Sequence, residues 1–216
     1  MMCQGYLELI IGPMYAGKST ELIRNITKFE NMNVNMNEKI KEKMVEKMVV
    51  INHKINNRYG SGGISTHNNE IYDSCIILDK LTDFESYENF HETKIIIIEE
   101  LQFFEDAYDT IVRWCDIYDK KIIAAGLDGD FQREPFGDVL RLIPHANKVS
   151  KMNALCSICK DGTDAPFTRR IVASKNKTLV GSCDVYEAVC RKHYLEASNM
   201  KKEQHNVFQT EASSCI

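Results

Sequence analysis

Residues 12–19 read Gly-Pro-Met-Tyr-Ala-Gly-Lys-Ser and match G-x-x-x-x-G-K-S/T in full, the pattern of a loop that binds phosphate. The pattern is informative only where it joins a strand to a helix. Here the apolar run 6–11 predicts a buried strand, and residues 18–29 predict a helix with its apolar side chains on one face. The context is the one that the motif requires, and a chance glycine-rich turn is the weaker interpretation.

A loop of this kind binds phosphate for two physical reasons. Its glycines let the backbone curve so that N–H groups point inward, and the N-terminus of the following helix adds about half a positive charge. Lys18 would reach the β- and γ-phosphates of a nucleotide, and Ser19 would bind Mg²⁺. The residues predicted to contact ATP here are Gly12, Pro13, Met14, Tyr15, Ala16, Gly17, Lys18, Ser19 and Thr20.

The fold class follows from the alternation of strands and helices. Further apolar runs predict buried strands at 49–51, 94–98 and 122–125. Residues 104–118 carry apolar side chains at helical spacing. This alternation favours an α/β domain at residues 1–150. We expect a parallel sheet flanked by helices, as in the phosphate-loop nucleoside triphosphatases. We interpret residues 31–48 as an exposed insertion or an extension of the first helix.

Two glutamates follow the apolar strand 94–98, where a phosphate loop requires a second acid to complete the Mg²⁺ shell. Side chains alternate along a strand, so Glu99 and Glu100 should point in different directions. We expect Glu99 to face Mg²⁺ and Glu100 to act as a general base on a substrate hydroxyl. Taken alone, the pair would also fit an ordinary charged strand end.

Cysteine spacing predicts a metal centre. Cys156 and Cys159 form a C-x2-C knuckle, and Cys190 and His193 form a C-x2-H knuckle. Three thiolates and one imidazole make a closed tetrahedral Zn²⁺ site, which is structural because it leaves no open position. Free buried cysteines or a redox pair are the alternatives, and Cys183 is a competing ligand with poorer spacing.

Composition limits the class of protein. The 216 residues carry a net charge of −4, so no overall positive field attracts nucleic acid or an anionic membrane. No run approaches the roughly 18 apolar residues of a membrane span, and the N-terminus lacks signal-peptide features. We therefore expect a cytoplasmic protein without nucleic-acid or membrane partners. We place a small zinc-binding domain at residues 151–195 and a disordered tail at 196–216.

Four local sequences carry a resemblance to a known family. The stretches 12–22, 102–104, 127–136 and 181–193 occur in this order, and together they resemble the cytosolic type II thymidine kinases of animals, bacteria and large DNA viruses. The resemblance covers about residues 6–194 and implies transfer of the ATP γ-phosphate to the 5′-hydroxyl of thymidine, in the salvage of DNA precursors, with deoxyuridine as a further substrate. It also implies a homotetramer and feedback inhibition by dTTP.

The resemblance assigns further roles by position. Glu100 matches the general base, and Arg58 and Gln102 match the phosphate side of the site. The segment between the zinc knuckles resembles a lasso that closes over thymidine and reads the base through its backbone. The residues implied to bind the nucleoside are Leu127, Phe131, Phe136, Thr168, Leu179, Val180, Gly181, Ser182 and Tyr186. Without the resemblance, most of these would be interpreted as core, packing or turn residues.

The chain departs from the family pattern at Glu99 and Leu101, where Asp and Gly are usual, and at Asn56, where an acid is common. Three rival functions stay open at this point. A phosphate-loop kinase could act on another nucleoside or small metabolite. An ATP-driven nucleic-acid module is disfavoured by the charge. A GTPase would need Asn-Lys-x-Asp, whereas Asn147-Lys148 continues as Val149-Ser150.

Overall fold

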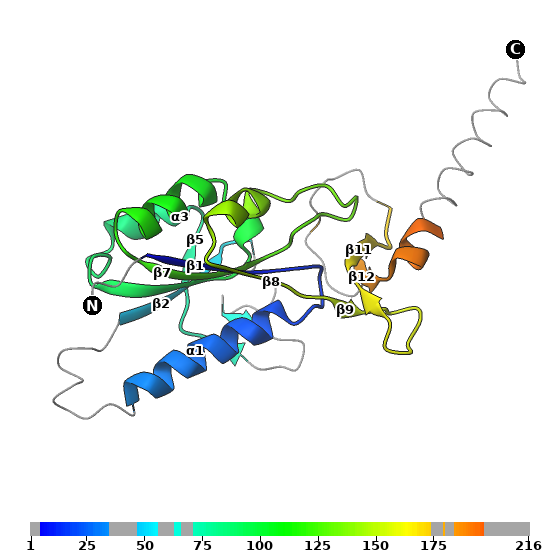
Figure 1. The fold of residues 1–216 in the computed structure, drawn as a ribbon, viewed down its shortest axis with the longest axis horizontal. Helices are drawn as coiled ribbons and strands as arrows, with labels where there is room; N and C mark the ends of the chain where they lie inside the picture. The colour runs from blue at the N-terminus through cyan, green and yellow to red at the C-terminus, as the bar shows by residue number, and fades with distance from the viewer. Residues whose placement is uncertain are drawn as a thin grey trace, which may run out of the picture.

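The structure is a computed structural model, and it describes residues 5–34, 47–55, 63–65, 71–173, 179 and 184–196. Figure 1 shows a central sheet with helices on both faces and a smaller cysteine-containing part beyond one end of the sheet. Among the described residues, no helix combines the length and the apolar character that crossing a membrane would require.

Six strands form the central sheet in the order β5-β2-β6-β7-β1-β8, and neighbouring strands run parallel. Their bounds are β1 Tyr6–Ile11, β2 Lys47–His53, β5 Ile76–Leu78, β6 Thr93–Ile98, β7 Lys121–Gly126 and β8 Lys148–Lys151. Strands β6 and β7 are buried on both faces, so their sequences are continuous apolar runs. The predicted α/β class with a parallel sheet is confirmed.

Helices cover both faces of this sheet (Figure 1). Helix α1 (Lys18–Val34) packs through Leu22, Ile26 and Phe29 on the face that carries Ile10 and Ile97. The other face is covered by α3 and the 3-10 helices, where the fully buried Trp114 forms the centre of the larger core cluster. The bounds are α3 Ala107–Asp116, η1 Leu81–Ser86, η2 Leu101–Phe103 and η3 Val139–His145.

Beyond the sheet, short strands form three two-stranded pairs. They are β3 Ile64–Ser65 with β4 Ile71–Tyr72, β9 Ala154–Leu155 with β10 Asp164–Ala165, and β11 Phe167–Arg170 with β12 Tyr186–Val189. Strands β9 to β12 share a core of small side chains that also includes Ala16 of the phosphate loop. The cysteine-containing part is therefore packed directly against the nucleotide-binding loop.

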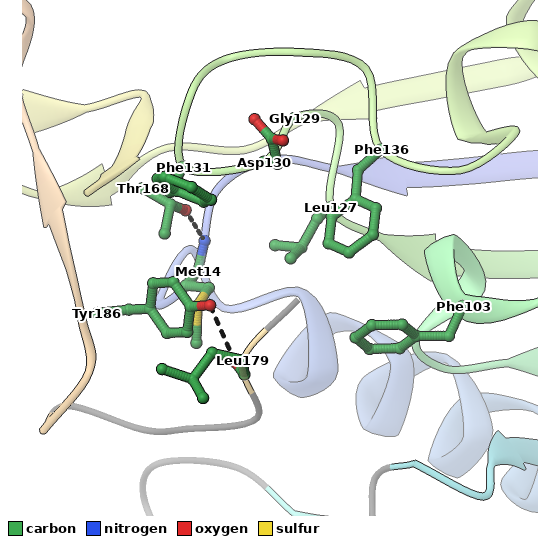
Figure 2. A pocket seen from close by; sticks show the side chains of 10 residues that line it. All are labelled: Met14, Phe103, Leu127, Gly129, Asp130, Phe131, Phe136, Thr168, Leu179 and Tyr186. Carbon is green, nitrogen blue, oxygen red and sulfur yellow. Dashed lines mark hydrogen bonds between the residues drawn. The ribbon is translucent and has the colours of Figure 1, made fainter. Parts of the chain in front are cut away.

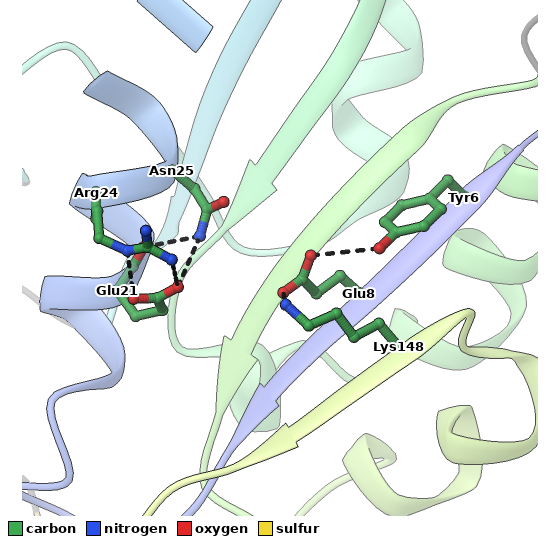
Figure 3. A network of polar contacts seen from close by, with 6 residues as sticks. All are labelled: Tyr6, Glu8, Glu21, Arg24, Asn25 and Lys148. Atoms are coloured by element: carbon green, nitrogen blue, oxygen red, sulfur yellow. Dashed lines mark hydrogen bonds and ion pairs between the residues drawn. The ribbon is translucent and has the colours of Figure 1, made fainter. Parts of the chain in front are cut away.

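The edge strand β8 was not predicted from the sequence. Its side chains are polar or half-exposed, and it is held to β1 by an ion pair across the register partners Glu8 and Lys148, whose Oε1 and Nζ lie 2.7 Å apart. Tyr6 donates to the other oxygen of Glu8 at 3.5 Å (Figure 3). Because a charged edge strand has no apolar periodicity, residues 148–151 did not stand out as a strand.

Three predicted boundaries differ from the structure. Helix α1 continues to Val34 instead of ending near Phe29. Residues 47 and 48, assigned to the insertion, belong to β2. The helix predicted at 104–118 is shorter, because Phe104 precedes it with extended backbone and Ile117 is its C-cap. The remainder of the insertion, at 35–46, and the tail from 197 lie outside the described residues.

Candidate active site and metal centre

The phosphate loop follows β1 and opens α1, as the motif requires. Gly12 and Gly17 have φ values of 149° and 82°, in the region that favours glycine. A Cβ at Gly12 would lie 2.4 Å from the carbonyl oxygen of Met152, so this glycine also permits close backbone approach. Tyr15 is left-handed too, with φ 66°, which turns the loop sharply beside the cavity described below.

Ser19, at the end of the phosphate loop, lies beside Glu99, which follows β6. The Ser19 hydroxyl donates to Oε1 of Glu99 at 2.6 Å. Glu99 is only 5% exposed, and its Oε2 is buried without a hydrogen-bond partner among the described residues. Burial, followed by the charge of Glu100, raises the pKa of Glu99 to about 8. A hydroxyl and a buried carboxylate with an unused oxygen suit a hard cation such as Mg²⁺.

Lys18 lies at the same place. Its Nζ donates to the carbonyl oxygen of Pro13 at 2.7 Å. Burial lowers the pKa of Lys18, and the carboxylates of Glu100, Glu99 and Asp128 oppose that shift. The Lys18 ammonium group therefore lies close to three carboxyl groups.

Glu100 stands at the end of β6 with left-handed backbone, φ 56° and ψ 41°. Its Oε2 accepts a hydrogen bond from Nε2 of Gln102 at 2.5 Å. The Oε1 of Gln102 accepts the N–H of Leu127 at 2.9 Å. Gln102 was expected on the phosphate side, and the structure places it as a buried link between Glu100 and the segment after β7.

Leu101 lies in the main core and not beside the pocket. Its side chain is fully buried. A Cβ built on Gly126 would lie 3.1 Å from the Cβ of Leu101, so the end of β7 and the start of η2 approach closely. The larger residue at position 101 is therefore accommodated by packing against β7.

A cavity opens between these segments and the cysteine-containing part. It is lined by Met14, Phe103, Leu127, Gly129, Asp130, Phe131, Phe136, Thr168, Leu179 and Tyr186. Figure 2 shows Phe131, Thr168, Tyr186 and Leu179 on one side, with Phe103 and Phe136 on the other. The structure therefore brings together six residues that the resemblance assigned to nucleoside binding. Val180, Gly181, Ser182 and Arg58 lie outside the described residues.

Two hydrogen bonds connect the phosphate loop to strands β11 and β12, which carry part of the cavity lining. The N–H of Met14 donates to Oγ1 of Thr168 at 3.0 Å, and the Tyr15 hydroxyl donates to the carbonyl oxygen of Tyr186 at 3.2 Å. The Tyr186 hydroxyl in turn donates to the carbonyl oxygen of Leu179 at 2.9 Å. The cavity and the phosphate loop therefore share atoms and form one site.

Some residues of the cavity were missed by sequence reasoning. Phe103 belongs to the stretch 102–104, but no role was predicted for it. The centroids of the Phe103 and Phe136 rings lie 5.5 Å apart, with the rings edge to face. Asp130 is buried, and its Oδ1 accepts the N–H groups of Gln132 and Glu134, which shapes the loop over the cavity. An aspartate followed by a polar turn is the local signal that could have indicated this role.

The candidate metal-binding cluster consists of Cys156, Cys159, Cys190 and His193, whose potential ligand atoms all lie within 4.8 Å of one another. Nδ1 of His193 lies 3.4, 3.4 and 3.3 Å from the three sulfur atoms in that order. Burial opposes ionisation of Cys156, but backbone N–H groups, including that of Cys190, outweigh it and lower its pKa to about 6. A donor set of three sulfurs and one nitrogen, already converged around a stabilised thiolate, is compatible with structural zinc.

A phosphate loop at the end of a parallel strand, a buried acid beside its serine and an adjoining aromatic cavity define a phosphate-loop enzyme of the kinase type. The thymidine kinase family model matches residues 5–194 of the chain. Thymidine kinases are also its relatives: that of Oryza sativa subsp. japonica is 34% identical over 215 residues, covering 98% of this chain and 74% of that protein. Those of Variola virus and Monkeypox virus are 36% and 37% identical over 202 residues, covering 89% of this chain and 98% of each viral protein. The chain belongs to the thymidine kinase family, and membership of this family implies that ATP and Mg²⁺ are used.

Proposed function

We propose that this enzyme transfers the γ-phosphate of ATP to the 5′-hydroxyl of thymidine and releases thymidine 5′-monophosphate and ADP. The observation that carries the proposal is the junction between the two halves of the site. Met14 belongs to the phosphate loop, lines the aromatic cavity and is hydrogen-bonded to Thr168, which lines the cavity beside it. A nucleoside in the cavity would therefore lie against the loop that holds the triphosphate.

The phosphate loop would hold ATP through its backbone N–H groups, with Lys18 on the β- and γ-phosphates and Thr20 following on the helix. Arg58 is assigned to the same phosphate side. Ser19 and Glu99 would hold Mg²⁺, which when bound supplies charge compensation for the phosphate oxygens. The unused Oε2 of Glu99 supports this assignment.

Glu100 is the proposed general base. Gln102 holds its Oε2, and we assign Oε1 to take the proton of the 5′-hydroxyl. The hydroxyl oxygen then bonds to the γ-phosphorus as the bond to the β–γ bridging oxygen breaks, and ADP leaves with that oxygen. Because Gln102 also holds the N–H of Leu127, the base and the cavity wall are fixed relative to one another.

The aromatic cavity is the proposed nucleoside site. Phe131 would stack on the base, with Leu127 and Phe136 beside it, and Tyr186 would contact the deoxyribose. Backbone groups of Leu179, Val180, Gly181 and Ser182 would read the edges of the base. Such recognition favours thymine over cytosine but accepts uracil, so deoxyuridine is a proposed second substrate.

We extend the proposal to the organisation of the enzyme. The cluster of three cysteines and His193 would hold zinc and secure the base of a nucleoside-closing unit at 151–195, separate from the domain at 1–150. Strands β9 to β12 have a core cluster distinct from the two clusters of the central sheet, although Ala16 of the phosphate loop contributes to it, and this supports that division. Three thiol ligands favour a reducing cytoplasmic location. A homotetramer and dTTP feedback follow from the family resemblance.

A phosphoryl-transfer assay with Mg-ATP tests the function. Thymidine, deoxyuridine, deoxycytidine, deoxyguanosine and buffer alone would be run in parallel on purified protein. We expect thymidine-dependent formation of the 5′-monophosphate with little turnover of deoxycytidine. ATP hydrolysis that ignores every nucleoside but increases with DNA would overturn the proposal.

A further inference from the structure

Strand β11 carries two adjacent arginines with opposite environments. Arg169 and Arg170 sit opposite Glu187 and Tyr186 in the antiparallel pair β11-β12. Directly opposite residues share a face of the pair, and successive residues alternate. Arg169 accordingly forms an ion pair with Glu187, whereas Arg170 lies with Tyr186 and is only 4% exposed. A buried arginine on the cavity side of the strand requires an explanation.

Arg170 contacts two residues of the nucleoside-cavity lining without lining the cavity itself. Its guanidinium carbon lies 3.8 Å from the centre of the Phe131 ring, and its Nη2 donates to the Tyr186 hydroxyl at 2.9 Å. That hydroxyl donates onward to the carbonyl oxygen of Leu179 at 2.9 Å. Phe131, Tyr186 and Leu179 all line the cavity, but Arg170 does not. The guanidinium therefore backs the Phe131 ring from outside and leaves its other face to the cavity.

We propose that Arg170 is a positioning residue for the nucleoside, acting through Phe131 and Tyr186. The inference rests on the proposed use of this cavity for thymidine. A planar guanidinium can stack on an aromatic face while its N–H groups, which lie in the guanidinium plane, bond a neighbour at its edge. One side chain thus fixes the tilt of the stacking ring and the place of the tyrosine hydroxyl. The same cation attracts electron density toward its own side of the Phe131 ring, so the face toward the cavity becomes less negative. Such a face favours stacking of a base whose ring carries carbonyl groups.

The role predicts a selective kinetic effect. Arg170→Met keeps much of the side-chain length and removes the charge and the donors. We expect the KM for thymidine to rise about 10- to 100-fold, since the lost interaction is a charged hydrogen bond with a stacking contact. The kcat at saturating thymidine and the KM for ATP should stay within about twofold, because the contacts that carry the proposal lead to Phe131 and Tyr186 of the cavity lining.

Two further variants separate positioning from general stability. Arg170→Lys keeps the charge but cannot stack and bond in one plane, so it should not restore the KM for thymidine. Tyr186→Phe removes the hydroxyl that Arg170 holds. In the double variant the rise in KM should be smaller than the product of the two single effects, because both changes break the same hydrogen bond. Arg141→Met, at an arginine paired with Asp138 on the surface, is the control for loss of an arginine.

Melting temperature and zinc content would be measured for every variant. If Arg170→Met does not fold, Arg170→Lys and Tyr186→Phe carry the test. A fall in kcat with an unchanged KM for thymidine, multiplicative effects in the double variant, or full rescue by lysine would overturn the proposal. Turnover of thymidine by the wild-type protein in the same assay tests the proposed function. The ratio of each variant's KM and kcat to the wild-type values tests the role of Arg170 alone.

Discussion

The backbone N–H of Met14 donates to Oγ1 of Thr168 at 3.0 Å, across 154 positions of the sequence. Met14 belongs to the loop that binds phosphate and Thr168 to strand β11 of the cysteine-containing part. Thr168 is only 5% exposed, so the bond is shielded from water. Its loss would leave a half-buried donor without a partner, which costs about 1–3 kcal/mol.

Thr168→Val tests this bond because it keeps the shape of the side chain and removes the acceptor. We expect a KM for thymidine about tenfold higher or more, since both residues line the cavity. Thr168→Ser is the matched control, because it keeps the oxygen and loses only the methyl group. If the serine variant is impaired as strongly as the valine variant, the methyl contact matters and the hydrogen bond does not.

Glu100→Gln tests the general base. Glutamine keeps the size of the side chain but cannot accept the proton of the 5′-hydroxyl as a carboxylate does. Phosphoryl transfer should fall about 10²- to 10⁴-fold while ATP still binds. Single-turnover rates and nucleotide titration would measure the two separately. Glu92→Gln, an exposed glutamate paired with Lys47, is the control, and wild-type turnover of Glu100→Gln would exclude Glu100 as the base.

Removal of the metal should unfold the cysteine-containing part. Cys156→Ser or a strong chelator would leave β9 to β12 with a core of few and small side chains. We expect the zinc content to fall, the melting temperature to decrease and thymidine binding to weaken. Cys75→Ser, at a cysteine outside the cluster, is the control. Active, well-folded wild-type protein that contains no zinc would contradict the assignment.

His53 should make the protein sensitive to acid. Burial lowers the pKa of His53 below 6.5, although the charge of Asp79 opposes the shift. Its Nδ1 accepts the N–H of Ile55 at 3.1 Å, a bond that the protonated ring would lose. The unfolded state therefore binds more protons, and the stability contributed by neutral His53 is lost as the pH falls through 6.5 toward the folded pKa.

The comparison variant for this effect is His53→Asn, which keeps an acceptor near the Nδ1 position but does not titrate. The free energy of unfolding would be measured by denaturant titration at about pH 7.5 and about pH 5.5. The wild-type protein should lose more stability than the variant between the two values. Equal losses would show that His53 does not carry the acid sensitivity.

Local motifs made part of the site predictable. The phosphate loop and the two knuckles bring their ligands together over a few residues, so spacing alone identified Lys18, Ser19 and the cluster of cysteines with His193. The two glutamates were identified because they follow an apolar strand, although strand alternation does not set their directions: β6 ends at Ile98 and Glu100 has left-handed backbone. The sheet was predictable in class because its central strands are continuous apolar runs, whereas β8 is short and charged.

The aromatic cavity was not predictable from spacing. Its walls come from the phosphate loop, η2, the segment after β7 and strands β11 and β12, which meet only in the folded chain. Family resemblance supplied Phe131, Thr168 and Tyr186. Nothing local distinguished Arg170 from Arg169, because the alternation that buries one and exposes the other requires knowledge of the pairing with β12.

The cluster of Cys156, Cys159, Cys190 and His193 has a consequence for how such enzymes can diversify. A zinc ion bound there, as proposed, would fasten the chain on both sides of the segment that lies between the knuckles, much as a chemical cross-link would. The entropy of closing a loop grows only slowly with its length, about 0.6 kcal/mol for each doubling. Residues can therefore be inserted or deleted between the knuckles without moving the points of attachment. The length of that segment can therefore vary at little cost in free energy.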